Sequence, residues 1–287
     1  MKNRPDRHVS SLISLLPASF LLLLLALTAC SQKSVETESV NVVEASISDI
    51  QSAILNGETN CRAVVQAYLD RIEAYDQSAG LNAITEINPR ALARADSIDQ
   101  MLSSGEDPGY LICTPILVKD NFDTYDLPTT GGSVALSGSI PPDDAFMVRR
   151  IREEGAIVIA KTNMAEWAFS PRQTISSSYD TTANAYAMDK TPAGSSGGTA
   201  SGVAASFGVA GLGSDTGNSI RGPSSHLSLV GIRSTIGLTS RDGVVPLAFD
   251  RDIAGPMTRT VEDAARIFNV VAGHDPADPY TEAGRNK

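Results

Sequence analysis

Apolar residues recur at every third or fourth position in several parts of the chain, which predicts amphipathic helices. The first two such segments lie at residues 50–54 and 64–72, where apolar positions alternate with charged ones. A third follows the pair Asn88-Pro89, which suits the cap and first turn of a helix, and it stops before Gly105. Three helices are therefore expected in the region that begins at Ile47.

Short β-branched runs at residues 116–118 and 156–160 predict buried strands. Residues 143–155 between them have helical periodicity and end in a glycine, so strand, helix and strand alternate as in an α/β domain. A stretch rich in Ser, Thr, Gly and Ala then extends from Lys161 to about Gly222, and such a composition also suits a flexible linker. Residues 199–213 are too apolar for a linker, however, and predict a packed helix followed by a buried strand.

The pattern at the N-terminus predicts a sorting signal in residues 1–29. Three basic residues precede an apolar run at 12–29, which is typical of a signal peptide, although a membrane anchor helix is the alternative. The run ends in Leu-Thr-Ala-Cys, which resembles a bacterial lipobox with Cys30 as the lipidated residue. We therefore expect an exported lipoprotein, anchored on the periplasmic or cell-surface side of a membrane. Residues 30–46 have the composition of a solvated tether, and residues 47–287 are expected to form the folded domain.

Composition narrows the class of protein further. Hydrophobic residues make up 42% of the chain and charged residues 20%, as in globular proteins, and the net charge is −10. An acidic chain without clustered Lys and Arg is a poor candidate for nucleic-acid binding.

Cys61 and Cys113 can form a bridge in an oxidising compartment, but two separate buried thiols are the favoured interpretation. Cysteine and histidine spacing indicates no metal or cofactor, and nothing indicates an oligomeric state.

Candidate chemistry centres on lysine and serine, because the chain has only three histidines. Lys119 ends an apolar strand segment, where burial would disfavour its charge and make it a base, although a solvated lysine at a strand end is the plainer alternative. Ser195 lies between glycines that permit a sharp turn. Ser219 follows a predicted strand in a turn whose backbone N–H groups can converge on an anion.

Taken together, these segments resemble the amidase signature family in both motif and order. The resemblance covers nearly all of residues 47–275. Its motifs are VKDN (118–121), GSSGG (194–198), GSDTGNSIRGPSS (213–225), GIRSTIGLTSRDGVVPL (231–247) and GPMTRTVEDAA (255–265).

The resemblance implies a fold and a set of roles. The fold is a mixed β-sheet core covered by helices. Family members use a Ser-cis-Ser-Lys triad, which places Ser219 as nucleophile, Ser195 as the bridging serine beside a cis peptide bond, and Lys119 as base. The backbone N–H groups of Thr216, Gly217, Asn218 and Ser219 would form the oxyanion hole, and Asp215 and Arg221 would support that loop. The expected substrate is a small amide or an amidated peptide, and no cofactor is required.

Four departures from the family pattern stand out. Asn218, Ala193 and Cys113 occupy positions where members usually have glycine. Members are also usually longer, so the domain is expected to be incomplete at its C-terminus, either as a fragment, which we favour, or as a truncated and inactive remnant.

Three other functions are left open by the sequence. A noncatalytic surface lipoprotein could retain the scaffold as a binding module. A component of the glutaminyl-tRNA amidotransferase shares the signature, but its cytosolic task conflicts with an export signal. A Ser-His hydrolase using His226 is disfavoured, because its surroundings predict core packing.

Overall fold

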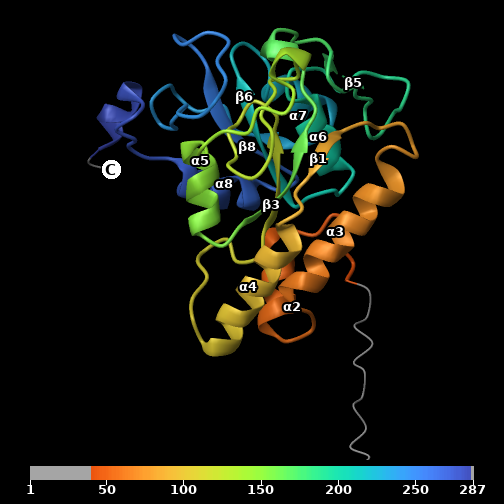
Figure 1. Cartoon of the computed structure of the whole chain (residues 1–287), viewed down its shortest axis with the longest axis vertical. Coiled ribbons are helices and arrows are strands. Elements are labelled where there is room, and N and C mark those ends of the chain that lie inside the picture. Colours follow the sequence, from red (N-terminus) through yellow and green to blue (C-terminus); the bar gives the residue numbers. More distant parts are fainter. Residues whose placement is uncertain (1–39, 286–287) are drawn as a thin grey trace, which may run out of the picture. The chain divides into compact units, whose positions relative to one another are not determined.

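Helices and strands alternate along residues 40–285, which are the residues that the computed structural model describes (Figure 1). The helices are α2 (Ile47–Leu55), α3 (Cys61–Tyr75), α4 (Ala91–Ser104), α5 (Phe146–Glu153), α6 (Gly197–Ala204), α7 (Arg221–His226) and α8 (Val261–Val271). One sheet contains β1 (Ile84–Ile87), β2 (Pro115–Lys119), β3 (Ile157–Thr162), β6 (Ala210–Asp215), β7 (Val230–Gly231) and β8 (Ile253–Thr258). The remaining elements are a hairpin of β4 (Ile175–Ser176) and β5 (Asp180–Thr181) and the 3₁₀ turns η1 (Val134–Leu136), η2 (Glu166–Ala168) and η3 (Pro279–Gly284).

The six strands form a mixed sheet in the order β1-β3-β2-β6-β8-β7. Strand β2 pairs in parallel with β3 on one side and with β6 on the other, whereas the outer strands join antiparallel. Every residue of β2, β3, β6 and β8 is buried, which explains their continuous apolar or small-residue sequences. The expected mixed sheet covered by helices is confirmed.

Helices cover both faces of this sheet (Figure 1). Helix α6 packs on β2 and β6 and also contacts α7, which lies against β7, while α5 and α8 pack against each other and the sheet on the other side. The close approach of α6 requires small residues: a Cβ on Gly198 would lie 2.2 Å from the carbonyl oxygen of Asn163, and one on Gly202 would lie 2.7 Å from Leu117 Cδ1. The Ser- and Gly-rich composition of this segment therefore reflects tight packing, and the linker alternative is wrong.

The predicted helices and strands are present, with small differences at their ends. Helix α4 begins at Ala91, two positions after Pro89, because Asn88 Oδ1 accepts the backbone N–H of Arg90 and holds a turn there (2.8 Å). Gly105 ends this helix in the left-handed conformation, as its position predicts.

The N-terminal end of the described part is packed rather than solvated. Val42 and Ala45 are buried, and Ser46 caps α2 by accepting the N–H of Asp49 while Asp49 accepts that of Ser46. The folded part therefore begins within the segment predicted as tether, ahead of Ile47.

The predicted signal peptide at 1–29 and Cys30 lie outside the described residues. No helix between residues 40 and 285 has the length and apolar character needed to span a membrane.

Cys61 and Cys113 form a disulfide bond, so the expectation of two separate buried thiols is wrong. Cys61 is the first residue of α3 and Cys113 precedes β2, and their Cα atoms lie 5.5 Å apart. Both residues are fully buried. The bond ties the N-terminal helices to the strand that carries Lys119.

Removing this disulfide is expected to destabilise the fold. The bond spans 52 positions of the sequence, and a loop of that length corresponds to about 4 kcal/mol in the chain-entropy model. Urea unfolding of the Cys61→Ser/Cys113→Ser double variant checks this against the parent under non-reducing conditions. Alkylation of both Cys61 and Cys113 in the non-reduced, folded parent would contradict the assignment.

Candidate active site

The parallel pairing of β2 and β6 brings two polar strand ends together. Val118 is paired with Leu212, so Lys119 at the end of β2 lies beside the last residues of β6. Its Nζ donates to Ser195 Oγ at 2.7 Å and to Ser214 Oγ at 2.9 Å, and it lies 3.4 Å from the carbonyl oxygen of Ser214. Lys119 is thus enclosed by hydroxyl and carbonyl groups and forms no ion pair within residues 40–285.

Burial gives this lysine an unusual protonation behaviour. Its side chain is fully buried, and loss of hydration lowers the pKa of Lys119 to about 7, although the charges of Asp215 and Asp252 act in the opposite direction. The ordinary pKa of lysine is about 10.4. A substantial share of Lys119 is therefore neutral near pH 7, and a neutral amine can accept a proton.

Ser195 reaches Lys119 through an unusual backbone conformation. The Gly194–Ser195 peptide bond is cis, which is the geometry that the resemblance implies. The carbonyl oxygen of Ser195 accepts the N–H of Ala165 (3.0 Å), and the N–H of Ser196 donates to the carbonyl oxygen of Ser219 (3.3 Å). This last bond places the Ser195 and Ser219 loops side by side. Among the described contacts, no hydrogen bond joins the two serine hydroxyls.

The departures from glycine have different structural consequences. Ala193 and Cys113 have φ of 65° and 49°, a region that glycine adopts freely and other residues rarely do. Asn218 has no positive φ, so this substitution does not strain the backbone. Its Nδ2 instead donates to the carbonyl oxygen of Pro171 (3.1 Å), which links the Ser219 loop to the loop after η2.

The loop at residues 216–219 presents a row of free backbone donors. In the described part of the chain, the N–H groups of these four residues donate no hydrogen bond. Gly217 faces open space, since a Cβ there would have no neighbour within 4 Å. Ser219 is only 5% exposed and is therefore largely enclosed. Free donors of this kind can hold an anion.

Asp215 fixes the shape of this loop. Its carboxylate accepts the backbone N–H groups of Ile220 (3.1 Å) and Arg221 (3.3 Å), and it pairs with the guanidinium groups of Arg221 and Arg233, each at 3.1 Å. Burial alone would raise the pKa of Asp215, but these hydrogen bonds, led by that from Arg221, hold it below its usual value. Arg221 also donates to the carbonyl oxygen of Gly217 (2.8 Å).

Three residues near Lys119 were missed by the sequence reasoning. Ser214 Oγ accepts both Lys119 Nζ and Asn121 Nδ2, each at 2.9 Å. Asp252 accepts the hydroxyl of Thr216 and the backbone N–H groups that follow Pro246. Asn121 and Ser214 lie inside the VKDN and GSDTGNS motifs, so their closeness in sequence to the predicted catalytic residues was the available signal. Asp252 lies outside every motif and had no such signal.

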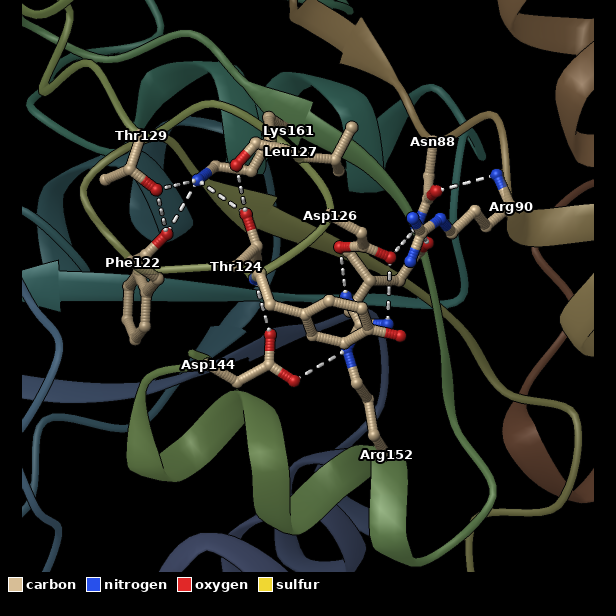
Figure 2. A network of polar contacts seen from close by, with 12 residues as sticks. Asn88, Arg90, Phe122, Thr124, Asp126, Leu127, Thr129, Asp144, Arg152 and Lys161 are labelled. Carbon is tan, nitrogen blue, oxygen red and sulfur yellow. Dashed lines mark hydrogen bonds and ion pairs between the residues drawn. The ribbon is translucent and has the colours of Figure 1, made fainter. Parts of the chain in front are cut away.

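A second buried lysine organises the loop that follows Lys119. Figure 2 shows Lys161 pointing at the Phe122 carbonyl oxygen and at Thr124 and Thr129, whose hydroxyls lie at 3.4 and 2.9 Å. Its Nζ is also 3.7 Å from Asp120 Oδ1. Burial lowers the pKa of Lys161 to about 8 and raises that of Asp120. Lys161 contacts neither predicted catalytic serine and is best understood as a support for this loop.

The same loop is anchored at its far side by an ion-pair network (Figure 2). Arg152 binds Asp126 through two nitrogens, at 2.7 and 3.1 Å, and Asp144 at 3.2 Å. Asn88 Nδ2 also donates to Asp126 (3.0 Å). These contacts fix residues 120–132 relative to α5 and to the start of α4.

His226 does not lie in the core, contrary to the expectation from its neighbours. It is exposed at the end of α7, and its Nδ1 lies 3.3 Å from the carbonyl oxygen of Thr191. Leu227 takes the buried position instead. No hydrogen bond joins His226 to Ser219 among the described residues.

The chain has an α/β fold with a buried lysine, a serine beside a cis peptide bond and a second serine on a loop of free backbone N–H donors. This is the architecture that the resemblance implies. A model of the Amidase family matches residues 63–285. The chain therefore belongs to the amidase family.

Its relatives include several enzymes. The chain is 43% identical over 234 residues to a glutamyl-tRNA(Gln) amidotransferase component from Gloeobacter violaceus, a match that covers 81% of this chain and 47% of the relative. The peptide amidase from Stenotrophomonas maltophilia superimposes with a TM-score of 0.83 at 40% identity, covering 86% of this chain and 52% of that one. An amidase family protein from Bacillus anthracis gives 0.81 at 38% identity, covering 86% and 50%. The chain thus spans about half the length of these relatives.

Proposed function

We propose that this protein hydrolyses the C–N bond of a carboxylic amide through an acyl-enzyme on Ser219. The observation that carries the proposal is the 2.7 Å hydrogen bond between Ser195 Oγ and the fully buried Lys119 Nζ. A buried, uncompensated amine next to a serine hydroxyl can act as a base, and the Ser195 loop is bonded to the Ser219 loop. Membership of the amidase family supports this reaction class.

The reaction follows from these positions. Ser219 Oγ attacks the amide carbonyl carbon while its proton passes through Ser195 to the neutral amine of Lys119. The N–H groups of residues 216–219 hold the negative oxygen of the tetrahedral intermediate, and each such donor contributes about 3–4 kcal/mol to the transition state. The C–N bond then breaks, and the proton from Lys119 is delivered to the leaving amine. Water hydrolyses the remaining ester by the same relay, releasing the carboxylic acid and Ser219.

Substrate class and cellular location are part of the proposal. A small amide or an amidated peptide is the substrate, in line with the peptide amidase among the structural relatives. The signal-like residues 1–29 and the lipobox cysteine Cys30 support export and lipid anchoring. The Cys61–Cys113 disulfide also favours an oxidising compartment, since such bonds rarely persist in the cytosol. This location argues against the transfer-RNA task of the amidotransferase relatives.

A direct assay distinguishes this enzyme from a noncatalytic lipoprotein. Incubation of the full chain with N-acetylphenylalanine amide is expected to release ammonia and N-acetylphenylalanine in equal amounts. Release at the same rate by the parent and by a Ser219→Ala variant would show that the scaffold is not catalytic at this site.

The same assay tests the Ser-His alternative. His226→Gln is expected to leave kcat within about twofold of the parent, because among the described contacts the imidazole meets only the carbonyl oxygen of Thr191 and neither predicted serine. A loss of a hundredfold or more would instead assign the base to His226 and overturn the lysine mechanism.

A further inference from the structure

Ser214 contacts the predicted base through two different oxygen atoms. Its Oγ lies 2.9 Å from Lys119 Nζ, and its backbone carbonyl oxygen lies 3.4 Å from the same nitrogen. Ser195 Oγ makes the third contact of this amine, at 2.7 Å. Two of the three oxygens around Lys119 Nζ therefore belong to a residue that has no role in the proposed proton relay.

A second side chain holds the Ser214 hydroxyl in place. Asn121 Nδ2 donates to Ser214 Oγ at 2.9 Å and to the carbonyl oxygen of Val245 at 3.3 Å. Asn121 is 2% exposed and Ser214 is 7% exposed, so water has little access to these contacts. The Ser214 hydroxyl oxygen is thus shared by two donors, one from Lys119 at the end of β2 and one from the turn that follows it.

The three oxygens around the amine suit both of its protonation states. A lysine ammonium has three N–H donors, so it can donate to Ser195 Oγ and to both Ser214 oxygens. After the loss of one proton, the amine keeps two N–H bonds and gains a lone pair. When the two Ser214 oxygens accept these N–H bonds, the lone pair is directed at Ser195 Oγ. This is the direction that the proposed relay requires.

The charged groups near Lys119 do not contact its amine within the described part of the chain. Burial lowers the pKa of Lys119, and the charges of Asp215 and Asp252 raise it only in part. Asp215 is already paired with two arginines. Helix α6 contains no charged residue, and Lys161 points to the opposite face of the sheet, where it meets Asp120. Direct support of the ammonium form therefore comes from the three neutral oxygens around it.

We infer that Ser214, held by Asn121, is a positioning residue that directs the lone pair of Lys119 at Ser195 and supports the protonated amine during the reaction. The inference rests on the proposed amidase function, in which Lys119 alternates between its two forms. Ser214 acts through Lys119 and exchanges no proton with the substrate. Without its hydroxyl, the buried ammonium has one acceptor fewer, so Lys119 becomes a weaker base.

The kinetic test removes this hydroxyl. Ser214→Ala is expected to reduce kcat roughly ten- to a hundredfold and to leave KM within about twofold, as befits the loss of one hydrogen bond to a charged group. The same loss lowers the pKa of Lys119, so the rising limb of kcat/KM should move to lower pH by about one unit. Ser214→Thr keeps the hydroxyl and is expected to restore the parental limb and most of the rate.

Ser196 supplies the matched control, because its hydroxyl donates to the Ser214 carbonyl oxygen (3.2 Å) and contacts no atom of Lys119 among the described contacts. Ser196→Ala should therefore keep the parental midpoint of the limb. A folded Ser214→Ala variant with reduced kcat but a parental midpoint would show that Ser214 is merely structural and would overturn the inference.

Direct titration of Lys119 keeps this test separate from the proposed function. NMR of the full chain, labelled with ¹³C at the lysine Cε atoms, follows the protonation of each lysine without turnover, and the Lys119 signal is identified by its loss in Lys119→Ala. The midpoint is expected to fall by about one pH unit in Ser214→Ala and to stay unchanged in Ser196→Ala and Ser214→Thr. This result supports the role of Ser214 even if no amide is hydrolysed, in which case only the proposed function fails. Equal midpoints in the parent and Ser214→Ala would overturn the inference whether or not the protein is an amidase.

Discussion

Substituting Lys119 by alanine is expected to reduce amide hydrolysis about 10³- to 10⁴-fold in kcat/KM, with little effect on substrate binding. Lys119 is the only group within hydrogen-bond reach of Ser195 Oγ among the described contacts that can accept a proton from it. Without this base, Ser219 must attack as a neutral hydroxyl. Initial rates of ammonia release at amide concentrations well below KM measure the loss.

The pH profile supplies the control for this variant. Burial lowers the pKa of Lys119 to about 7, so its neutral form increases as pH rises. The parent's kcat/KM should therefore rise about tenfold per unit below pH 7 and level off above it. Lys119→Ala should lose this limb, whereas Lys190→Ala, at an exposed lysine paired with Asp189, should keep it. A Lys119 variant with parental rates and an unchanged limb would exclude lysine as the base.

Substituting Ser195 by alanine is expected to reduce kcat by at least 10²-fold, because it removes the hydroxyl that contacts Lys119 Nζ. The effect should fall on kcat, since Ser195 is fully buried and offers little surface for substrate binding. Stopped assays over a range of amide concentrations separate kcat from KM.

Ser196 offers a matched control in the same segment. It is equally buried, but its hydroxyl donates to the carbonyl oxygen of Ser214 (3.2 Å) rather than contacting Lys119. Ser196→Ala is expected to cost much less activity than Ser195→Ala. If the two variants lost activity equally, general disturbance of the loop would explain the result and the relay would lose its support.

Much of the fold could be predicted because local patterns and packing agree. The strand runs at 116–118 and 156–160 and the helix at 143–155 appear as β2, β3 and α5. Lys119 was identifiable for a physical reason: a lysine at the end of an apolar strand must be solvated or deprotonated, and the resemblance favoured the second outcome. The structure buries Lys119 fully, so the alternative of a solvated lysine at a strand end is wrong.

Other features depend on contacts between residues distant in the sequence, which no local pattern contains. The Cys61–Cys113 bond requires α3 to meet the chain before β2, 52 positions away. His226 follows an apolar pattern but lies on the exposed side of a helix too short to show a periodicity. Asp252 reaches Thr216 only because β8 pairs with β6.

Reaction of the full chain with a fluorophosphonate probe tests most directly whether Ser219 is a nucleophile activated by Lys119. Peptide mapping by mass spectrometry is expected to find one adduct, on Ser219, that forms rapidly in the parent and Lys190→Ala proteins and at least a hundredfold more slowly in Lys119→Ala. A folded parent protein that gains no adduct, or an adduct on a serine other than Ser219, would contradict the account.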